Sequence, residues 1–192
     1  MSSRHGDPTG LEVEALGALA STETSAAAGS AAALCGAAAA AVVIKASGSS
    51  GRPGEAAQGS ALRDRLMRLA GVDAATLAAA REALASAGRG DGASEQRDFQ
   101  LGRLVRQASV APREIAEACV DVAVLAAGES ERVADDLRPD AVAAAFLAAG
   151  AAEAAAHLVS INLVLQEGDE EVVRARRAAR AAAEVVEQLR AT

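Results

Sequence analysis

The sequence predicts an all-α protein, a bundle of six to seven helices. Apolar residues recur at the three- and four-residue spacing of helices, and no stretch alternates between apolar and polar residues as a half-buried strand does. Only two of the 192 residues are aromatic, Phe99 and Phe146. The core must therefore consist of Ala, Val, Leu and Ile side chains, which favours closely packed helices over a β-sandwich.

Turn residues and helix-starting residues divide the chain into a tail and a series of helical blocks. A polar segment, residues 1–10, is expected to form a disordered tail, and residues 11–192 to form one folded domain. The predicted helices are Leu11–Ala20, Ser30–Ala46, Ala61–Ala87, Glu95–Ala108, Pro112–Ala127, Pro139–Leu165 and Glu170–Arg190.

Two of these helices begin with proline. Pro112 and Pro139 suit the first turn of a helix, where the missing backbone N–H costs nothing. Glu114 and Asp140 follow them, and a carboxylate is favoured near the positive end of the helix dipole. Between two other helices lies Ser47–Ser60, "SGSSGRPGEAAQGS", whose composition predicts a long flexible loop.

Charge and composition exclude several classes of partner. The net charge is −7 and stacking aromatics are scarce, so neither duplex nor single-stranded nucleic acid is an expected ligand. Cys35 and Cys119 lie in apolar helical pattern without a CxxC spacing, and no metal site is expected. The polar N-terminus has no signal-peptide pattern, and the apolar run 31–44 is too short to span a bilayer. We therefore expect a cytoplasmic protein with no membrane partner.

The Gly29-Ser30 step before the most apolar helix has two interpretations. A serine at this position is a common helix N-cap, typically worth about 1 kcal/mol. Alternatively, the step belongs to a loop whose glycine lets backbone N–H groups approach an anionic ligand. The sequence alone leaves both open.

Three segments together resemble the cyclodeaminase/cyclohydrolase family. They are "LASTETSAAAGSAAALCGA", "APREIAEACVDVAVLA" and "PDAVAAAFLAAGAAEAAAHLVSINL". The family comprises all-helical dimeric domains, found as the deaminase half of formiminotransferase-cyclodeaminase and as bacterial methenyltetrahydrofolate cyclohydrolases. The similarity extends from about Leu11 to Leu165. It implies a homodimer that acts on a small molecule, a tetrahydrofolate derivative, with no tightly bound cofactor.

The family reaction forms or opens a five-membered methenyl ring that bridges two nitrogens of tetrahydrofolate. It requires a group that moves protons and stabilises a cationic carbon, and groups that orient the substrate. The resemblance implies that the catalytic carboxylate is Asp140, which matches a Ser-Asp step of the family. The implied substrate-binding residues are Gly29, Ser30, Asp73, Asn162, Lys45, Arg52 and His157.

Each of these residues also has a structural interpretation. Asp140 can simply complement a helix N-terminus, a contribution of roughly 0.3–1 kcal/mol. Asn162 lies in an apolar stretch, where a buried amide needs hydrogen-bond partners. Asp73 fits a surface charge, His157 a structural histidine, and the arginines of 174–180 a solvated helix face.

Three functions are consistent with the sequence. The first is a folate cyclohydrolase or cyclodeaminase. The second is an enzyme of the same fold that cyclises, dehydrates or deaminates another nitrogenous metabolite, because the family's Pro-Gly-Gly-Gly-Ser loop is here Ala-Ala-Ala-Gly-Ser, residues 26–30. The third is a non-catalytic helical dimer.

Overall fold

The computed structural model describes residues 9–22, 28–87, 94–163 and 168–191, which form six helices and no strand. This confirms the predicted all-α class. The helices are α1 (Thr9–Ala20), α2 (Ala28–Ser49), α3 (Pro53–Ala87), α4 (Ser94–Ser130), α5 (Arg138–Asn162) and α6 (Glu170–Ala191). Thr9 and Gly10 are thus helical, whereas the rest of the predicted tail lies outside the described residues.

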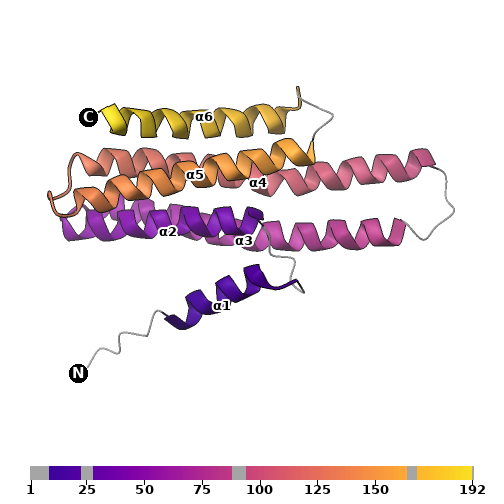
Figure 1. The fold of residues 1–192 in the computed structure, drawn as a ribbon, viewed down its shortest axis with the longest axis horizontal. Coiled ribbons are helices and arrows are strands. Elements are labelled where there is room, and N and C mark those ends of the chain that lie inside the picture. The colour runs from indigo at the N-terminus through magenta and orange to yellow at the C-terminus, as the bar shows by residue number, and fades with distance from the viewer. Residues whose placement is uncertain (1–8, 23–27, 88–93, 164–167, 192) are drawn as a thin grey trace.

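The core is a layered bundle of long helices (Figure 1). Helices α2, α3, α4 and α5 pack together, and α6 covers α4 and α5. Helices α2 and α5 run antiparallel, since Cys35 contacts Leu147 while Lys45, ten residues further along α2, contacts Asp140. Helix α1 lies apart from the bundle, and its Leu16 is 66% exposed.

Small side chains let the core helices approach closely. The buried residues are mostly alanines, joined by larger side chains such as Leu66, Ile115 and Val122. Gly36 of α2 faces Cys119 of α4, and a Cβ at Gly36 would lie 2.5 Å from the Cys119 sulfur. The core therefore lacks large aromatic side chains and is filled by helices whose backbones lie close together.

Two of these helices also have the length and composition of membrane spans. They are α2 and α5, whose most apolar stretches are 50% and 44% buried within the bundle. Helix α2, at 22 residues, is longer than the apolar run considered in the sequence. The core helix of a soluble protein has the same properties, so length and composition do not indicate a membrane location.

The predicted flexible loop at Ser47–Ser60 is wrong. Helix α2 continues to Ser49 and α3 begins at Pro53, which leaves a turn of three residues. The backbone N–H of Arg52 donates to the Ser47 carbonyl, 2.9 Å away, and closes this turn. Glycine and serine suggested a loop, but Ser47 is fully buried against α4, and Pro53 is well suited to a first helical turn.

The two helices predicted on either side of Pro112 are one helix, so the bundle has fewer elements than the upper estimate. Pro112 lies inside α4 and is fully buried. Proline in a helix interior costs about 3 kcal/mol through a lost hydrogen bond and a clash. The apolar residues that follow it, among them Ile115 and Cys119, are fully buried in the core, and this burial offsets that cost.

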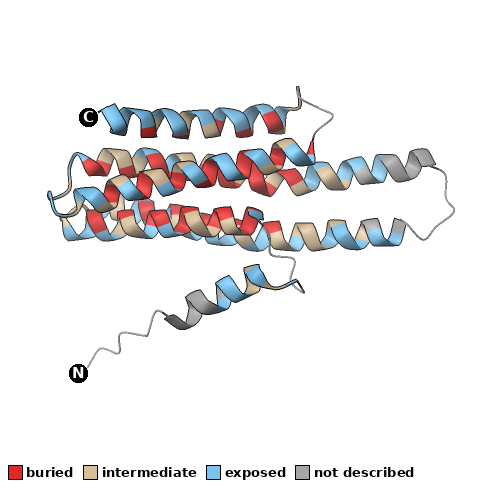
Figure 2. Ribbon diagram, viewed as in Figure 1, coloured by how far each residue is buried: buried red, intermediate tan, exposed pale blue. Residues whose placement is uncertain are grey.

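The far halves of α3 and α4 extend past the rest of the bundle as an antiparallel arm (Figure 2). No described residue of α3 beyond Asp73, and none of α4 before Ser109, is buried. Phe99, near the end of this arm, is 68% exposed. We call residues 74–87 and 94–108 the arm. Asp73 and Ser109 therefore mark the boundary between the packed bundle and the arm.

The turn between α2 and α3 depends on Gly51. Its φ is +68°, the left-handed region that costs an L-residue roughly 1–2 kcal/mol. Gly51→Ala is therefore expected to lower the free energy of unfolding by about 1 kcal/mol, as measured by urea denaturation. Gly54→Ala, in the first turn of α3 with open space around it, is the matched control and should cause no loss.

Candidate functional site

The N-terminus of α2 and the middle of α3 meet at a buried carboxyl group. Asp73 is only 7% exposed. The Ser30 hydroxyl lies 3.0 Å from Asp73 Oδ2 and 3.1 Å from the Ala70 carbonyl oxygen. The backbone N–H of Ser30 also bonds to the Asp73 carboxyl. Burial raises the pKa of Asp73, while the hydrogen bonds from Ser30 lower it by less.

The Ser30 hydroxyl can serve both protonation states of Asp73. When Asp73 is ionised, the hydroxyl can donate to its carboxylate. When Asp73 is protonated, it can donate to Ser30 Oγ, and the hydroxyl proton is free to turn to the Ala70 carbonyl. A carboxyl with a raised pKa and partners for both forms is suited to taking up and releasing a proton.

The N-cap interpretation of Ser30 is wrong. Ser30 is the third residue of α2, and its hydroxyl bonds to α3 instead of to the first turn of its own helix. The carboxyl that accepts a backbone N–H of this turn comes from Asp73, a neighbour in space. This contact complements the positive end of the α2 dipole.

Gly29 makes room for this carboxyl. A Cβ on Gly29 would lie 2.6 Å from Asp73 Cγ, a separation that side chains do not tolerate. Gly29→Ala is therefore expected to displace Asp73 and to lower the free energy of unfolding by roughly 1–3 kcal/mol, the cost of overpacking a well-packed region, as measured by urea denaturation. Gly71→Ala, on α3 with nothing within 4 Å, is the control that should cause no loss.

Asp140 lies at the opposite end of α2 from this carboxyl. It is in the first turn of α5, as predicted, 3.5 Å from the Lys45 ammonium group. Both side chains are well exposed, at 47% and 68%, so their ion pair contributes little stability. Fifteen residues of helix separate Ser30 from Lys45, or about 22 Å. One chain therefore does not bring Asp140 to Ser30.

Arg52 is engaged by carboxylates of its own chain. Its guanidinium bonds to Glu129 of α4 at 3.0 Å and also to Glu55. Glu129 is fully buried and accepts a second hydrogen bond, 2.7 Å long, from Ser47. Sequence reasoning missed Glu129, whose one signal was a carboxylate directly after the uncharged run "VAVLAAG", residues 122–128.

The remaining two predicted binding residues lie on the surface. Asn162 is the last residue of α5 and is exposed, so the expectation of a buried amide is wrong. His157 is one to two turns earlier and is also exposed. Both are nonetheless at the same end of the bundle as Ser30, because α5 runs antiparallel to α2.

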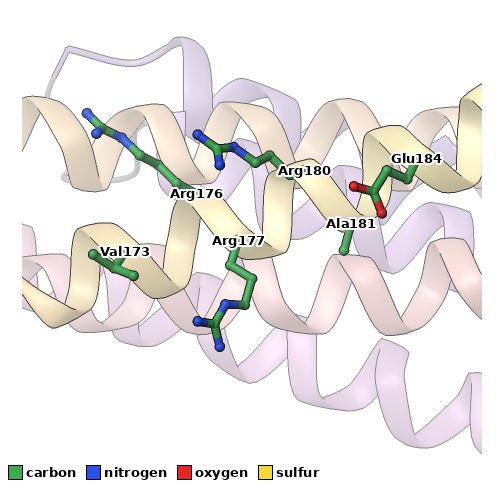
Figure 3. Close-up of a pocket in the computed structure, with 6 residues that line it drawn as sticks. All are labelled: Val173, Arg176, Arg177, Arg180, Ala181 and Glu184. Atoms are coloured by element: carbon green, nitrogen blue, oxygen red, sulfur yellow. The ribbon is translucent and has the colours of Figure 1, made fainter.

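The arginines of α6 surround a shallow cavity of about 440 Å³ (Figure 3). Arg176 and Arg180 point to one side of the helix, and Arg177 points to the other. All three are exposed, as expected for a solvated helix face. Arg174 instead bonds to Glu117 of α4 at 2.8 Å.

Among the described residues, the cysteines and carboxylates form no cluster of three or more metal-ligating side chains. Cys35 and Cys119 are free thiols, and burial raises the pKa of Cys119 to about 12. In the described part of the chain, no group of three or more His, Cys, Asp or Glu side chains is placed to hold a metal ion. The buried carboxyl of Asp73 with Ser30 and Gly29 is thus the principal candidate site, and we call it the Asp73 site.

Comparison with known proteins agrees with this fold. The bundle is similar to the crystal structure of formiminotetrahydrofolate cyclodeaminase from Thermotoga maritima, with a TM-score of 0.64 and 18% identity. The match covers 89% of this chain and 92% of that chain, and at this identity it shows a shared fold. No curated protein is similar enough in sequence to count as a match.

A family model described as formiminotransferase-cyclodeaminase matches residues 13–182. The chain therefore belongs to the formiminotransferase-cyclodeaminase family. The matched range contains all the residues of the Asp73 site, and Asp140 with its partner Lys45.

Proposed function

We propose that this protein is a cytoplasmic, homodimeric enzyme that closes or opens the C–N ring of a tetrahydrofolate one-carbon unit. The observation that carries the proposal is Asp73: a buried carboxyl with a raised pKa, hydrogen-bonded to Ser30 at a helix N-terminus. Family membership and the fold of the Thermotoga maritima cyclodeaminase support the substrate class.

The chemistry needs one group that both accepts and donates a proton. In the deaminating direction, a substrate nitrogen attacks the carbon of the protonated, cationic formimino group, and a tetrahedral carbon with three nitrogens forms. The Asp73 carboxylate takes the proton from the attacking nitrogen and gives it to the departing amine. Ammonia leaves, and the cationic methenyl ring remains. The raised pKa of Asp73 brings it closer to neutrality, where such a transfer is efficient.

Ser30 and Gly29 are proposed to position this group. The Ser30 hydroxyl holds the carboxyl in place and follows its protonation, and Gly29 keeps the space around it clear. A carboxylate near the cationic ring also stabilises its charge. In this proposal His157 and Asn162, at the same end of the bundle as Ser30, are candidates for orienting the substrate, whereas Asp140, Lys45 and Arg52 lie at the opposite end of α2 in the same chain.

The test is turnover of 5-formiminotetrahydrofolate and of methenyltetrahydrofolate by the purified protein, followed by the absorbance of the methenyl group. Calorimetric titration with 5-formyltetrahydrofolate measures binding separately. We expect turnover above the buffer rate, and a binding affinity that Ser30→Val reduces. Folded protein that neither binds a reduced folate nor accelerates either reaction would rule the folate function out.

One observation favours a second candidate, an enzyme of the same fold with another substrate. Residues 26–28 are alanines where the family pattern has Pro and two glycines. A Cβ restricts both φ and the approach of backbone N–H groups to an anion. The test is turnover of imine or amidine metabolites by the purified protein. A metabolite that the protein converts only when Asp73 is present, and that reduced folates do not displace, would favour this candidate.

A further inference from the structure

A second cavity of about 440 Å³ lies where α4 ends, α5 begins and α6 ends, at one end of the bundle (Figure 1). Sites for small molecules have volumes of about 300–1,000 Å³. Val124 of α4 lines this cavity and is 54% exposed, although the two residues before it are fully buried. The other large apolar side chains in the lining are Val142, Val185 and Leu189. The cavity thus presents branched aliphatic surface that no part of the bundle covers.

Three polar side chains line the same cavity, one from each side. Arg138 is the first residue of α5, Glu131 follows the last residue of α4, and Gln188 lies in the last turn of α6. All three residues are exposed. Within the described part of the chain, none of these side chains has a hydrogen-bond or ion-pair partner, and Arg138 and Glu131 do not pair with each other. The cavity therefore carries one cation, one anion and one amide, all available to a ligand.

The stability of the helices does not explain the two charges. The start of a helix favours an anion, and its end favours a cation, because of the helix dipole. Arg138 is at the start of α5 and Glu131 is just beyond the end of α4, so each lies at a helix end that favours the opposite charge. A ligand that brings a negative group to Arg138 and a positive group to Glu131 does account for them.

An aliphatic α-amino acid has the chemistry that this cavity matches. The planar guanidinium of Arg138 can hold its carboxylate through two parallel hydrogen bonds. The carboxylate of Glu131 can accept hydrogen bonds from its ammonium group, and the amide of Gln188 has a donor and an acceptor for either group. The branched aliphatic lining removes its side chain from water.

From these observations we propose that the cavity between α4, α5 and α6 binds a free aliphatic α-amino acid, such as leucine, as a zwitterion. This binding site is separate from the Asp73 site. Arg138 is two residues before Asp140, at the opposite end of α2 from Ser30. The proposal goes beyond the folate reaction, and no part of it depends on that reaction.

The first experiment is calorimetric titration of the purified full-length protein with L-leucine and with three probes that each lack one of its features. Isocaproate lacks the ammonium group, isoamylamine lacks the carboxylate, and glycine lacks the side chain. We expect saturable binding of L-leucine and binding at least about tenfold weaker for each probe, because each loses a charged hydrogen bond or the aliphatic contact. Absence of leucine binding, or equal affinity for isocaproate or isoamylamine, would overturn the proposal.

The second experiment places the ligand in the cavity. Arg138→Gln and Glu131→Gln should each weaken leucine binding by at least about tenfold. Both residues are exposed, so neither substitution disturbs the core. The matched controls are Arg176→Gln and Asp135→Asn, which remove exposed charges outside this cavity and should bind leucine as the wild type does. Unchanged affinity in both cavity variants would show that leucine binds elsewhere and would refute the site.

Thermal unfolding provides a further readout that needs no enzyme activity. A ligand that binds only the folded protein raises the unfolding midpoint as its concentration increases. L-leucine should therefore raise the midpoint of the wild type and of Asp73→Asn, and should have little effect on Arg138→Gln. Loss of the leucine effect in Asp73→Asn would place leucine at the Asp73 site and contradict the proposal.

The proposal and the folate function can fail separately. Folate turnover by a protein that does not bind leucine would leave the function standing and exclude the amino-acid site. Leucine binding that depends on Arg138, in a protein without folate turnover, would establish the amino-acid site and exclude the function.

Discussion

Asp73→Asn is expected to lower kcat by at least about 100-fold, the lower end of what a general acid–base group contributes. Asparagine has nearly the same shape and can still accept the hydrogen bond from the Ser30 hydroxyl. It cannot take up or release a proton, so the loss reports on proton transfer and not on packing. Turnover of the folate substrate at saturating concentration measures this loss.

The same substitution should change the dependence of stability on pH. Burial raises the pKa of Asp73 above its ordinary value of 3.8, so the folded protein binds this proton more tightly than the unfolded chain does. The free energy of unfolding therefore falls as the pH rises through the raised pKa, because the buried group must then ionise. Asp73→Asn removes this fall and should be as stable as the wild type, or more stable, at neutral pH.

The pH profile of kcat provides a second readout. Because the carboxylate form must accept the first proton, kcat is expected to fall on the acid side through a pKa above 3.8. Asp121→Asn is the matched control: Asp121 also has a pKa raised by burial, but it lies on α4 beside Arg65. Equal losses in the two variants would refute a special role for Asp73.

Glu129→Ala is expected to lower the free energy of unfolding by about 3 kcal/mol, the low end of the cost of breaking a buried ion pair. Glu129 is fully buried and joins Ser47 of α2 to Arg52 before α3. Its removal leaves a cavity, a buried hydroxyl without its acceptor, and a guanidinium whose remaining partner is Glu55. Urea denaturation monitored by circular dichroism measures the change.

The control for this prediction lies two residues further along the chain. Glu131 is exposed just beyond the end of α4, and Glu131→Ala should change stability by no more than about 0.5 kcal/mol. Glu129→Gln separates charge from shape, since the amide side chain keeps the volume and an acceptor oxygen for the Ser47 hydroxyl. A Glu129→Ala variant as stable as Glu131→Ala would mean that Arg52 and Ser47 find other partners at no cost.

Local patterns in the sequence predicted most of the helices, because burial of one helical face imposes a spacing that single residues reveal. Pro139 marked a helix boundary correctly, since α5 begins at Arg138, one residue before it. Pro112 and the Ser47–Ser60 segment led to wrong predictions of helix ends. Their residue types are typical of helix ends and loops, but tertiary packing decides whether the helix continues. The burial of Ser47 and Pro112 is a property of neighbours that are distant in sequence.

The candidate site was predictable only in part for the same reason. Family resemblance pointed to Gly29, Ser30 and Asp73 separately, but their contact joins positions 43 residues apart. The bond between Ser47 and Glu129 joins positions 82 residues apart, and no motif indicates it. The sequence correctly predicted that Asp140 lies at the start of a helix. Its distance from Ser30 could not be predicted, because that distance depends on the antiparallel packing of α2 and α5.

The arm formed by the far halves of α3 and α4 has a consequence for native-state hydrogen exchange. Its helical hydrogen bonds are not covered by a second layer of side chains, since none of its described residues is buried. Opening the arm therefore exposes little new apolar surface and requires far less free energy than unfolding the bundle. The amide protons of the arm should exchange with solvent deuterium early. Slow exchange should begin at Asp73 and Ser109, where the packed bundle begins.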